Sequence, residues 1–278
     1  MSSNKPGIQP TQPIEGVKHL IAVGSGKGGV GKTTVAVNLA VSLASLGHQV
    51  GLMDADVYGP NVPRMMGVKG VPEVAGEMMQ PIERYGIKVM SMGFLNPEER
   101  PLVWRGPMLH SVIQQFLRNV DWGRLEYLVI DLPPGTGDVQ LSLVQTVPIS
   151  GALIVTTPSD VSLEDARKAV LMFRQVRAEI LGIVENMSYL IAPQSKERID
   201  VFGTGGGKRT AEAMEVPFLG ELPLDPEVRV ACDAGDPVAL REDGSAASVS
   251  AFHTLARRTI ERIQEVGGPE GPSITVEE

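Results

Sequence analysis

Short apolar runs recur along the chain, separated by longer stretches in which apolar positions follow the period of a helix. Continuous apolar runs of this length are typical of strands covered on both faces of a sheet. They predict strands at 19–23, 49–54, 87–92, 127–131, 151–157, 180–186 and 216–222. The intervening stretches predict helices at 33–46, 105–119, 138–147, 162–178, 206–215 and 247–265. Because strands that alternate with helices pair in parallel through right-handed crossovers, we expect an α/β fold, mainly parallel, with helices on both faces of the sheet.

The predicted elements run from residue 17 to residue 266 without a clear linker, which predicts a single domain over 17–266. Residues 1–16 are rich in Pro, Ser and Gln and lack the apolar segment of a signal peptide, so we expect a disordered N-terminal arm. Residues 267–278 are acidic and rich in Gly and Pro, which predicts a flexible tail. The stretch 57–101 has weak periodicity, so we expect irregular structure there with one small β excursion.

The composition is that of an ordinary globular protein, with 42% hydrophobic and 21% charged residues among 278. No apolar run approaches the roughly 18 residues that span a bilayer. The net charge is -8 and the basic residues are scattered, which argues against binding to nucleic acid or to an anionic membrane surface. We therefore expect a cytoplasmic protein with no nucleic-acid or membrane partner.

A glycine-rich loop, GSGKGGVGKTT, follows the first predicted strand and precedes a predicted helix. It fits the pattern G-x-x-x-x-G-K-[ST], in which glycines bring backbone N–H groups close to phosphate and the helix directs its positive end to the same place. The Lys32 ammonium then reaches the β- and γ-phosphates, and the Thr33 hydroxyl ligates Mg²⁺. The loop therefore predicts an ATP and Mg²⁺ site. Its lining residues are Gly26, Lys27, Gly28, Gly29, Val30, Gly31, Lys32, Thr33 and Thr34.

Acidic residues end two of the predicted strands. MDADVYGPN contains Asp54 and Asp56, and YLVIDLPPGTGD contains Asp131, with two glycines in the turn behind it. A single Asp at such a place often only caps a turn. Phosphoryl transfer, however, needs a metal that neutralises charge and a positioned water. Together with the loop, these carboxylates predict an ATPase that hydrolyses ATP to ADP and phosphate.

The loop contains a second lysine, Lys27, and GKGGVGKT resembles the deviant Walker A motif of the superfamily of MinD, ParA and the nitrogenase iron protein. The resemblance implies that Lys27 reaches across a homodimer interface to the ATP of the partner subunit. It also implies that Asp131 holds Mg²⁺ through water, that Asp56 orients the attacking water and that Asp54 assists through Mg²⁺-bound water. The catalytic residues would then be Lys27, Lys32 and Asp56.

The same resemblance implies two further parts of the site. The turn 133–138 corresponds to switch II, which senses the γ-phosphate. Asn186 and Pro223 stand where these proteins flank adenine, although an Asn at the end of a strand is more often a turn residue.

Several longer runs resemble one branch of the superfamily, the Mrp/Nbp/ApbC proteins, which are ATP-dependent iron-sulfur cluster carriers. The most specific runs are DADVYGPNVPRMMG, YLVIDLPPGTGDVQLSL, VENMSYL, FGTGGGKRTAE and GELPLDPEVR. The likeness covers about residues 16 to 265. It implies a homodimer that acts on iron-sulfur client or assembly proteins.

One departure from this branch concerns the cluster ligands. Members normally follow ENMSY with a C-P-x-C motif, and two such motifs in a homodimer supply four thiolates to a bridging [4Fe-4S] cluster. Here Ala192 and Ser195 occupy those positions, and neither side chain replaces a soft thiolate. The one cysteine, Cys232, lies in a remote segment that we expect to be helical and to bury its thiol. Either the lineage lost the bridging site or the cysteines were replaced deliberately, and the sequence leaves both open.

Three functions remain in competition. The first is a homodimeric ATPase that carries or assembles iron-sulfur clusters, with cluster handling impaired. The second is a metal-free, ATP-dependent scaffold or regulator, which the absence of the two cysteines favours. The third is a positioning ATPase similar to MinD or ParA, which needs an amphipathic tail or a basic surface. The apolar stripe of the last predicted helix, which includes Phe252, Leu255, Ile260 and Ile263, is better explained by core packing.

Overall fold

An eight-stranded sheet forms the centre of the computed structural model, which describes residues 12–57, 59–95, 106–241 and 247–267. Its strands are β1 (Val17–Gly24), β2 (Val50–Asp54), β5 (Ile82–Arg84), β6 (Ile87–Ser91), β7 (Leu125–Asp131), β8 (Gly151–Thr156), β9 (Ile180–Glu185) and β12 (Phe218–Glu221). They lie in the order β12-β9-β8-β1-β7-β2-β6-β5. All neighbours are parallel except β5 and β6. All seven predicted strands belong to this sheet, and β5 is the added one.

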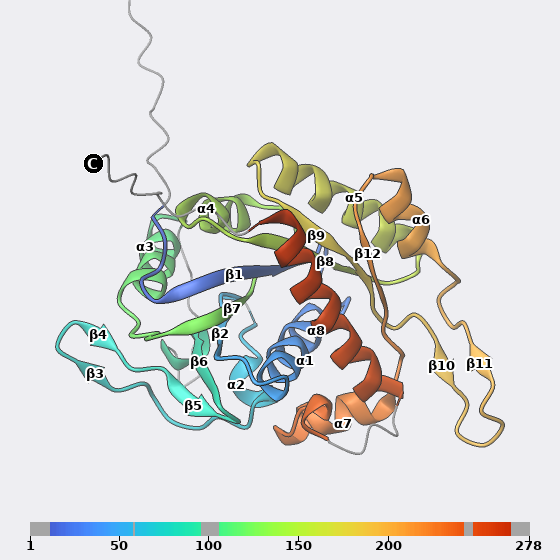
Figure 1. Ribbon diagram of the computed structural model, residues 1–278, viewed down its shortest axis with the longest axis horizontal. Helices are drawn as coiled ribbons and strands as arrows, with labels where there is room; N and C mark the ends of the chain where they lie inside the picture. Colours follow the sequence, from blue (N-terminus) through green and yellow to red (C-terminus); the bar gives the residue numbers. More distant parts are fainter. Residues whose placement is uncertain (1–11, 58, 96–105, 242–246, 268–278) are drawn as a thin grey trace, which may run out of the picture.

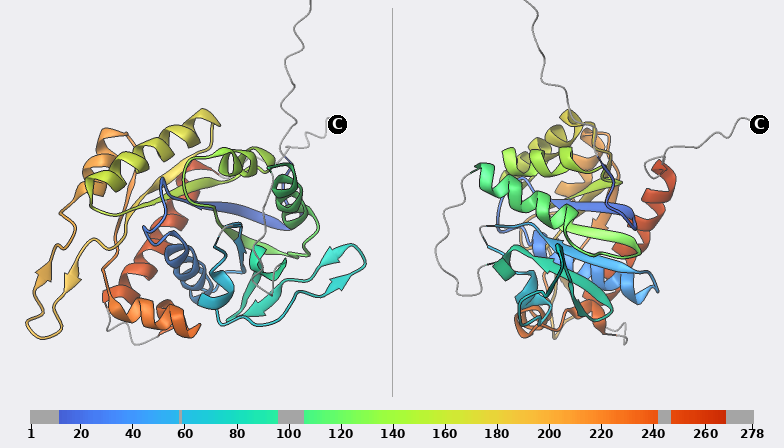
Figure 2. Two further views of the ribbon diagram at one scale, coloured as in Figure 1. Left: turned by 180° about the vertical axis from the view of Figure 1, so that it is seen from behind. Right: turned by 90° about the vertical axis from the view of Figure 1, so that its left-hand side faces the viewer.

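Helices cover both faces of the sheet (Figures 1 and 2). One face carries α1 (Lys32–Ser45), α2 (Val62–Met65), α7 (Pro226–Ala234) and α8 (Ala247–Val266). The other carries α3 (Gly106–Arg118), α4 (Asp138–Thr146), α5 (Asp160–Gln175) and α6 (Gly206–Ala213). Because of this double cover, β2, β8 and β9 are buried at every position, which is why they read as continuous apolar runs. The predicted mainly parallel α/β fold is confirmed.

Short elements account for most differences from the sequence pattern. Within 57–95 the structure contains α2, a hairpin of β3 (Val74–Ala75) and β4 (Met78–Met79), β5 and a 3-10 turn, η1 (Met92–Leu95). A second hairpin, of β10 (Leu190–Ile191) and β11 (Arg198–Ile199), was not predicted, and a further 3-10 turn, η2 (Val238–Leu240), precedes α8. The hairpin of β3 and β4 lies where one small β excursion was expected, whereas the two-residue strands β10 and β11 are too short to leave a periodic signal, so the pattern missed them.

Helix α7 contains Cys232, in the segment that we expected to be helical. Local chemistry sets its ends. The Asp225 carboxylate accepts a hydrogen bond from the amide of Glu227, Pro226 occupies the first turn, and Gly235 ends the helix with a φ of 76°. These are the residue types that begin and end helices.

The ends of the chain lie mostly outside the described residues, which leave out 1–11 and 268–278. The last part of the expected arm packs against the fold, since Ile14 is 5% exposed and Arg118 donates to the carbonyls of Gln12 and Pro13. The bounds of the arm, the domain and the tail remain predictions. Among the described helices, none is long and apolar enough to cross a membrane.

Candidate functional site

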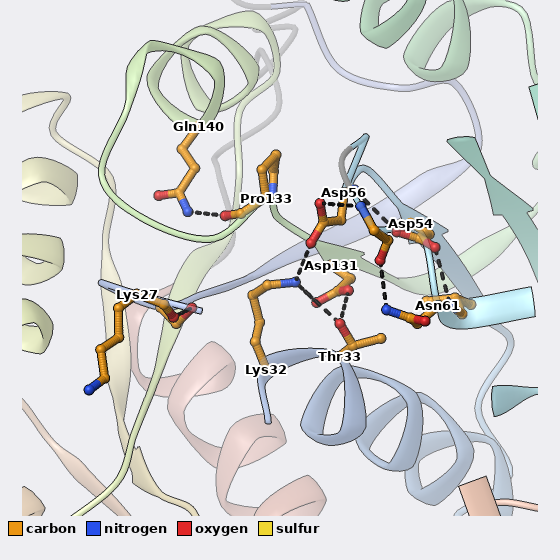
Figure 3. A network of polar contacts seen from close by, with 12 residues as sticks. Lys27, Lys32, Thr33, Asp54, Asp56, Asn61, Asp131, Pro133 and Gln140 are labelled. Atoms are coloured by element: carbon orange, nitrogen blue, oxygen red, sulfur yellow. Dashed lines mark hydrogen bonds and ion pairs between the residues drawn. The ribbon is translucent and has the colours of Figure 1, made fainter. Parts of the chain in front are cut away.

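The candidate site lies where the carboxyl ends of β1, β2 and β7 meet (Figure 3). The parallel register pairs Asp131 at the end of β7 with Asp54 of β2 on one side and Val23 of β1 on the other. The glycine-rich loop leaves β1 and enters α1 at Lys32. Since parallel strands end at one edge of a sheet, groups from three distant stretches of sequence converge there.

Lys32 and Thr33 both contact Asp131. The Lys32 Nζ lies 2.7 Å from one carboxylate oxygen of Asp131, and the Thr33 hydroxyl donates to the other at 2.7 Å. Lys32 also lies 3.8 Å from the Asp56 carboxylate. Lys32 is 6% exposed and Asp131 is fully buried, so these charges interact with little solvent screening. The structure thus brings together four of the residues that the sequence assigned to this chemistry.

The buried carboxylates are electrostatically strained. Burial raises the pKa of Asp131, and the Lys32 ammonium and the Thr33 hydroxyl oppose that shift. Burial, and then the charge of Asp131, raises the pKa of Asp54 to about 7. Three carboxylates face a single ammonium, so an additional cation at this edge would relieve their repulsion.

Hard oxygen donors suit Mg²⁺, and the adjacent Thr33 hydroxyl and Asp131 carboxylate are such donors. Within the residues that the structure describes, no group of three or more His, Cys, Asp or Glu side chains forms a metal site by itself.

The glycine-rich loop is held in a conformation that needs glycine. Gly29 and Gly31 have φ angles of 81° and 82°, in the left-handed region. A Cβ on Gly31 would lie 2.2 Å from Asn186 Nδ2, and one on Gly26 would lie 2.0 Å from the carbonyl of Asp165 in α5. The Ser25 hydroxyl donates to the carbonyl of Lys27 at 2.9 Å. Both packing and backbone conformation therefore fix the path of the loop.

Asn186 lies beside this loop, and the segment that contains Pro223 lies beside Asn186 in the fold. Asn186 Nδ2 donates to the Val30 carbonyl at 2.9 Å, across 156 positions of sequence. Leu222 donates to the Glu185 carbonyl at 2.8 Å, which brings the segment of Pro223 next to the end of β9. The predicted adenine contacts thus come from neighbouring segments, and their role remains a prediction.

Lys27 behaves differently from Lys32. Figure 3 shows its side chain directed away from Lys32 and from the carboxylates of Asp56 and Asp131. It is partly exposed. Its ammonium therefore does not belong to the cluster within its own chain.

Two residues at this edge escaped the sequence analysis. Ser91, at the end of β6, donates its hydroxyl to Asp54 at 2.9 Å. Gln140 in α4 donates its side-chain amide to the Pro133 carbonyl in the predicted switch II turn, and its own carbonyl oxygen is buried with no partner among the described residues. The amide of Gly135 in that turn donates to the Ser25 carbonyl at 3.1 Å, which ties the turn to the loop. Only the register of β6 beside β2 could have identified Ser91.

Asp54 accepts more hydrogen bonds than the sequence indicated. One carboxylate oxygen accepts from the amide of Asp56 at 3.1 Å, and the other accepts from the amide of Val62 at 3.1 Å as well as from Ser91. Asp54 is fully buried. It therefore organises the loop that follows β2, in addition to any contact with metal-bound water.

Ala192 and Ser195 lie in the turn of the hairpin formed by β10 and β11. Ala192 exchanges backbone hydrogen bonds with Glu197 and Lys196 at 2.9 and 3.0 Å, and the exposed Ser195 hydroxyl donates to the Glu197 carboxylate at 3.1 Å. Cys232 is 3% exposed and packs against α1, where Asn38 Nδ2 lies 3.8 Å from its sulfur. With this one thiol buried away from the hairpin, the side chains present do not fit an iron-sulfur cluster.

Comparisons with known proteins agree with this geometry. The family model described as NUBPL iron-transfer P-loop NTPase (ParA) matches residues 16–260. An iron-sulfur cluster carrier protein of Deinococcus radiodurans is 56% identical over 250 residues, which cover 89% of this chain and 71% of the relative. The iron-sulfur cluster transfer protein NUBPL of Mus musculus is 49% identical over 261 residues, which cover 93% and 82%.

A solved nucleotide-binding protein from Archaeoglobus fulgidus, in complex with ADP, is 39% identical and has a TM-score of 0.74 over 86% of this chain and 93% of that chain. The family match spans the loop, both acidic strand ends and the hairpin. The chain therefore belongs to the NUBPL iron-transfer P-loop NTPase family.

Proposed function

We propose that this protein is an Mg²⁺-dependent ATPase that acts as a homodimer in the transfer or assembly of iron-sulfur clusters. The observation that carries the proposal is the buried cluster in which Lys32 and Thr33 contact Asp131 and Lys32 also lies near Asp56. A lysine, a hydroxyl and two carboxylates at the end of a phosphate-binding loop are the groups that phosphoryl transfer requires.

Each group has one task in this proposal. The loop amides and Lys32 hold the β- and γ-phosphates, while Thr33 and Asp131 hold Mg²⁺. When bound, Mg²⁺ neutralises the charge that develops on the phosphoryl oxygens. Asp56, 3.8 Å from Lys32, orients the attacking water. Asn186 and Pro223 flank the adenine.

Lys27 is the group that would act in the partner subunit. Its side chain is directed away from the cluster of its own chain, as an intermolecular finger requires (Figure 3). Such a finger stabilises transition-state charge and is worth about 10³-fold or more in rate. The active site would then be complete only in the dimer.

The residues of this chain support cluster handling less directly than they support ATP hydrolysis. The relatives described as cluster carriers support a role with iron-sulfur clients, for which the cluster is cargo. Ala192 and Ser195 supply no thiolate for that cargo. This observation favours the second candidate, a metal-free scaffold or regulator that uses ATP to change partners.

Mixing two inactive variants tests the shared active site. Lys27→Ala and Asp56→Asn should each bind ATP and hydrolyse it very slowly. In a mixed dimer, the Asp56→Asn subunit supplies an intact Lys27 to the site whose Asp56 is intact. Random mixing of symmetric dimers should restore roughly a quarter of wild-type activity. Failure of the mixture to exceed either variant alone would overturn the intermolecular role.

Anaerobic reconstitution tests the cargo. The protein with Ala192 and Ser195 should bind no cluster, whereas Ala192→Cys with Ser195→Cys should acquire the visible absorbance, iron and sulfide of a [4Fe-4S] centre. Ser195→Cys alone is the matched control, because a dimer of it offers two thiolates instead of four. If the double variant also remains colourless, the hairpin is not a former cluster site, and the scaffold function is preferred.

A further inference from the structure

The Asp54 carboxylate joins three parts of the fold at the end of β2. It accepts hydrogen bonds from the backbone amides of Asp56 and Val62, each at 3.1 Å, and from the Ser91 hydroxyl at 2.9 Å. The first amide lies near the start of the loop that follows β2, and the second lies in α2, where that loop ends. Both ends of the loop are therefore fastened to one buried carboxylate.

Ser91 holds that carboxylate from the neighbouring strand. Asp54 and Ser91 are register partners in the parallel pair of β2 and β6, and both are fully buried. The Ser91 oxygen also accepts the amide of Gly93 at 3.0 Å. A hydroxyl has one proton to donate. Because a lone pair of the Ser91 oxygen accepts the Gly93 amide, the Ser91 proton is free to be donated to Asp54. The Asp54 carboxylate is therefore held by a residue of β6 as well as by its own loop.

This arrangement bears on the proposed chemistry through Asp56. The Asp56 amide is one of the two that Asp54 fastens, and the Asp56 carboxylate lies 3.8 Å from Lys32. Any rotation of the Asp54 side chain would release that amide and move the carboxylate relative to the phosphate site. Displacements of about 1 Å in such groups cost on the order of 10²-fold in rate.

We infer that Ser91 is a positioning residue for ATP hydrolysis, which acts through Asp54 to fix the backbone that carries Asp56. This inference rests on the proposed ATPase function. Ser91 is not among the residues proposed to contact nucleotide or metal, so its removal should affect the chemical step more than ATP binding.

Ser150 provides a matched control. It is also a buried serine, 3% exposed, and its hydroxyl accepts a backbone amide, that of Leu20, at 3.2 Å. It directly precedes β8, at the opposite end of the sheet from the site. Ser150→Ala therefore removes a comparable buried hydrogen bond without touching Asp54.

The experiment compares steady-state ATP hydrolysis and melting temperature for wild type, Ser91→Ala, Ser91→Thr and Ser150→Ala. Since a buried hydrogen bond to the Asp54 carboxyl group is removed, Ser91→Ala should lower kcat about tenfold and change KM less than about twofold. Ser91→Thr keeps the donor and should restore most of kcat. Ser150→Ala should melt at a similarly reduced temperature and keep wild-type kcat.

Two further readouts separate positioning from general weakening. Amide exchange at Asp56 and Val62 should accelerate in Ser91→Ala and stay unchanged in Ser150→Ala. In an Asp54→Asn background, adding Ser91→Ala should lower kcat by less than about twofold, because residues in one network are not additive.

Equal kcat losses from Ser91→Ala with and without Asp54→Asn would overturn the inference, as would unchanged exchange at both amides. If wild type fails to hydrolyse ATP, the proposed function falls. The exchange data, and the same double-mutant comparison made by melting, would still decide whether Ser91 fixes the loop.

Discussion

Lys32 and Asp131 form a buried ion pair, 2.7 Å apart, at the edge of the sheet where β1, β2 and β7 end. The pair is not isolated, because Asp56 lies 3.8 Å from Lys32 and the charge of Asp131 acts on Asp54. Lys32 is thus a common counter-ion for several carboxylates. Because one ammonium neutralises several carboxylates, removing Lys32 and removing a single carboxylate should have unequal effects on stability.

We expect Lys32→Met to destabilise the fold more than Asp131→Asn. Without Lys32, three buried carboxylates lose their cation, and breaking a buried pair typically costs about 3–5 kcal/mol. Without the Asp131 charge, Lys32 keeps Asp56 and the repulsion on Asp54 falls. Urea unfolding without nucleotide or divalent cation measures the free energy of unfolding of both variants. An equal or larger loss for Asp131→Asn would contradict the view of Lys32 as a shared counter-ion.

Gly31→Ala should damage the loop more than Gly29→Ala. Both glycines have φ angles near 80°, so both substitutions incur a backbone penalty of about 1–2 kcal/mol. Only at Gly31 would the new Cβ collide, 2.2 Å from Asn186 Nδ2, since nothing lies within 4 Å of that position at Gly29. Without nucleotide, we expect the free energy of unfolding of Gly31→Ala, measured with urea, to be lower than that of Gly29→Ala by about 1 kcal/mol or more. Equal midpoints would show that Asn186 yields without cost.

The Cys232 thiol should be almost inert in the folded protein. Burial raises its pKa, and thiolate is the reactive form. Alkylation by iodoacetamide at pH 8 should be at least about tenfold slower than in urea. The variant Ser195→Cys, with its thiol on the exposed hairpin turn, provides a fast-reacting control in the same fold. Rapid native alkylation of Cys232 would reopen its candidacy as a ligand.

His19 should contribute a loss of stability as the pH drops from 7 to 5, whereas Asp54, whose pKa is raised to about 7, contributes in the opposite direction. Burial lowers the pKa of His19, and a nearby Lys18 charge lowers it further. The unfolded chain, with a histidine pKa of about 6.5, therefore takes up the proton first as the pH falls, and unfolding is favoured until the pH passes the lower folded value. His19→Gln should remove this contribution, so that its unfolding free energy falls less, or rises more, than that of the wild type between pH 7 and pH 5.

The His19 measurement is a series of urea midpoints between pH 5 and 7. His253, whose pKa burial also lowers, gives a second variant, His253→Gln, for comparison. An unchanged slope in both variants would mean that neither ring loses its proton on folding.

The sequence determined the features that depend on neighbours along the chain. Seven strands and six helices follow from runs and periods, and the loop before α1 follows from spacing, because glycines, Lys32 and Thr33 act within one turn of backbone. Asp54, Asp56 and Asp131 were found because parallel strands end at a common edge. The absence of thiols at Ala192 and Ser195 is likewise a fact of sequence.

The tertiary structure decided which of these groups touch. Strand order and register place Ser91 on Asp54, and the approach of β9 to the loop lets Asn186 reach the Val30 carbonyl. The hairpin of β10 and β11 and the edge strand β5 were also invisible beforehand, since their few residues carry no period. Such contacts join positions 37 to 156 residues apart, and only the packing of whole elements brings those atoms within hydrogen-bonding distance.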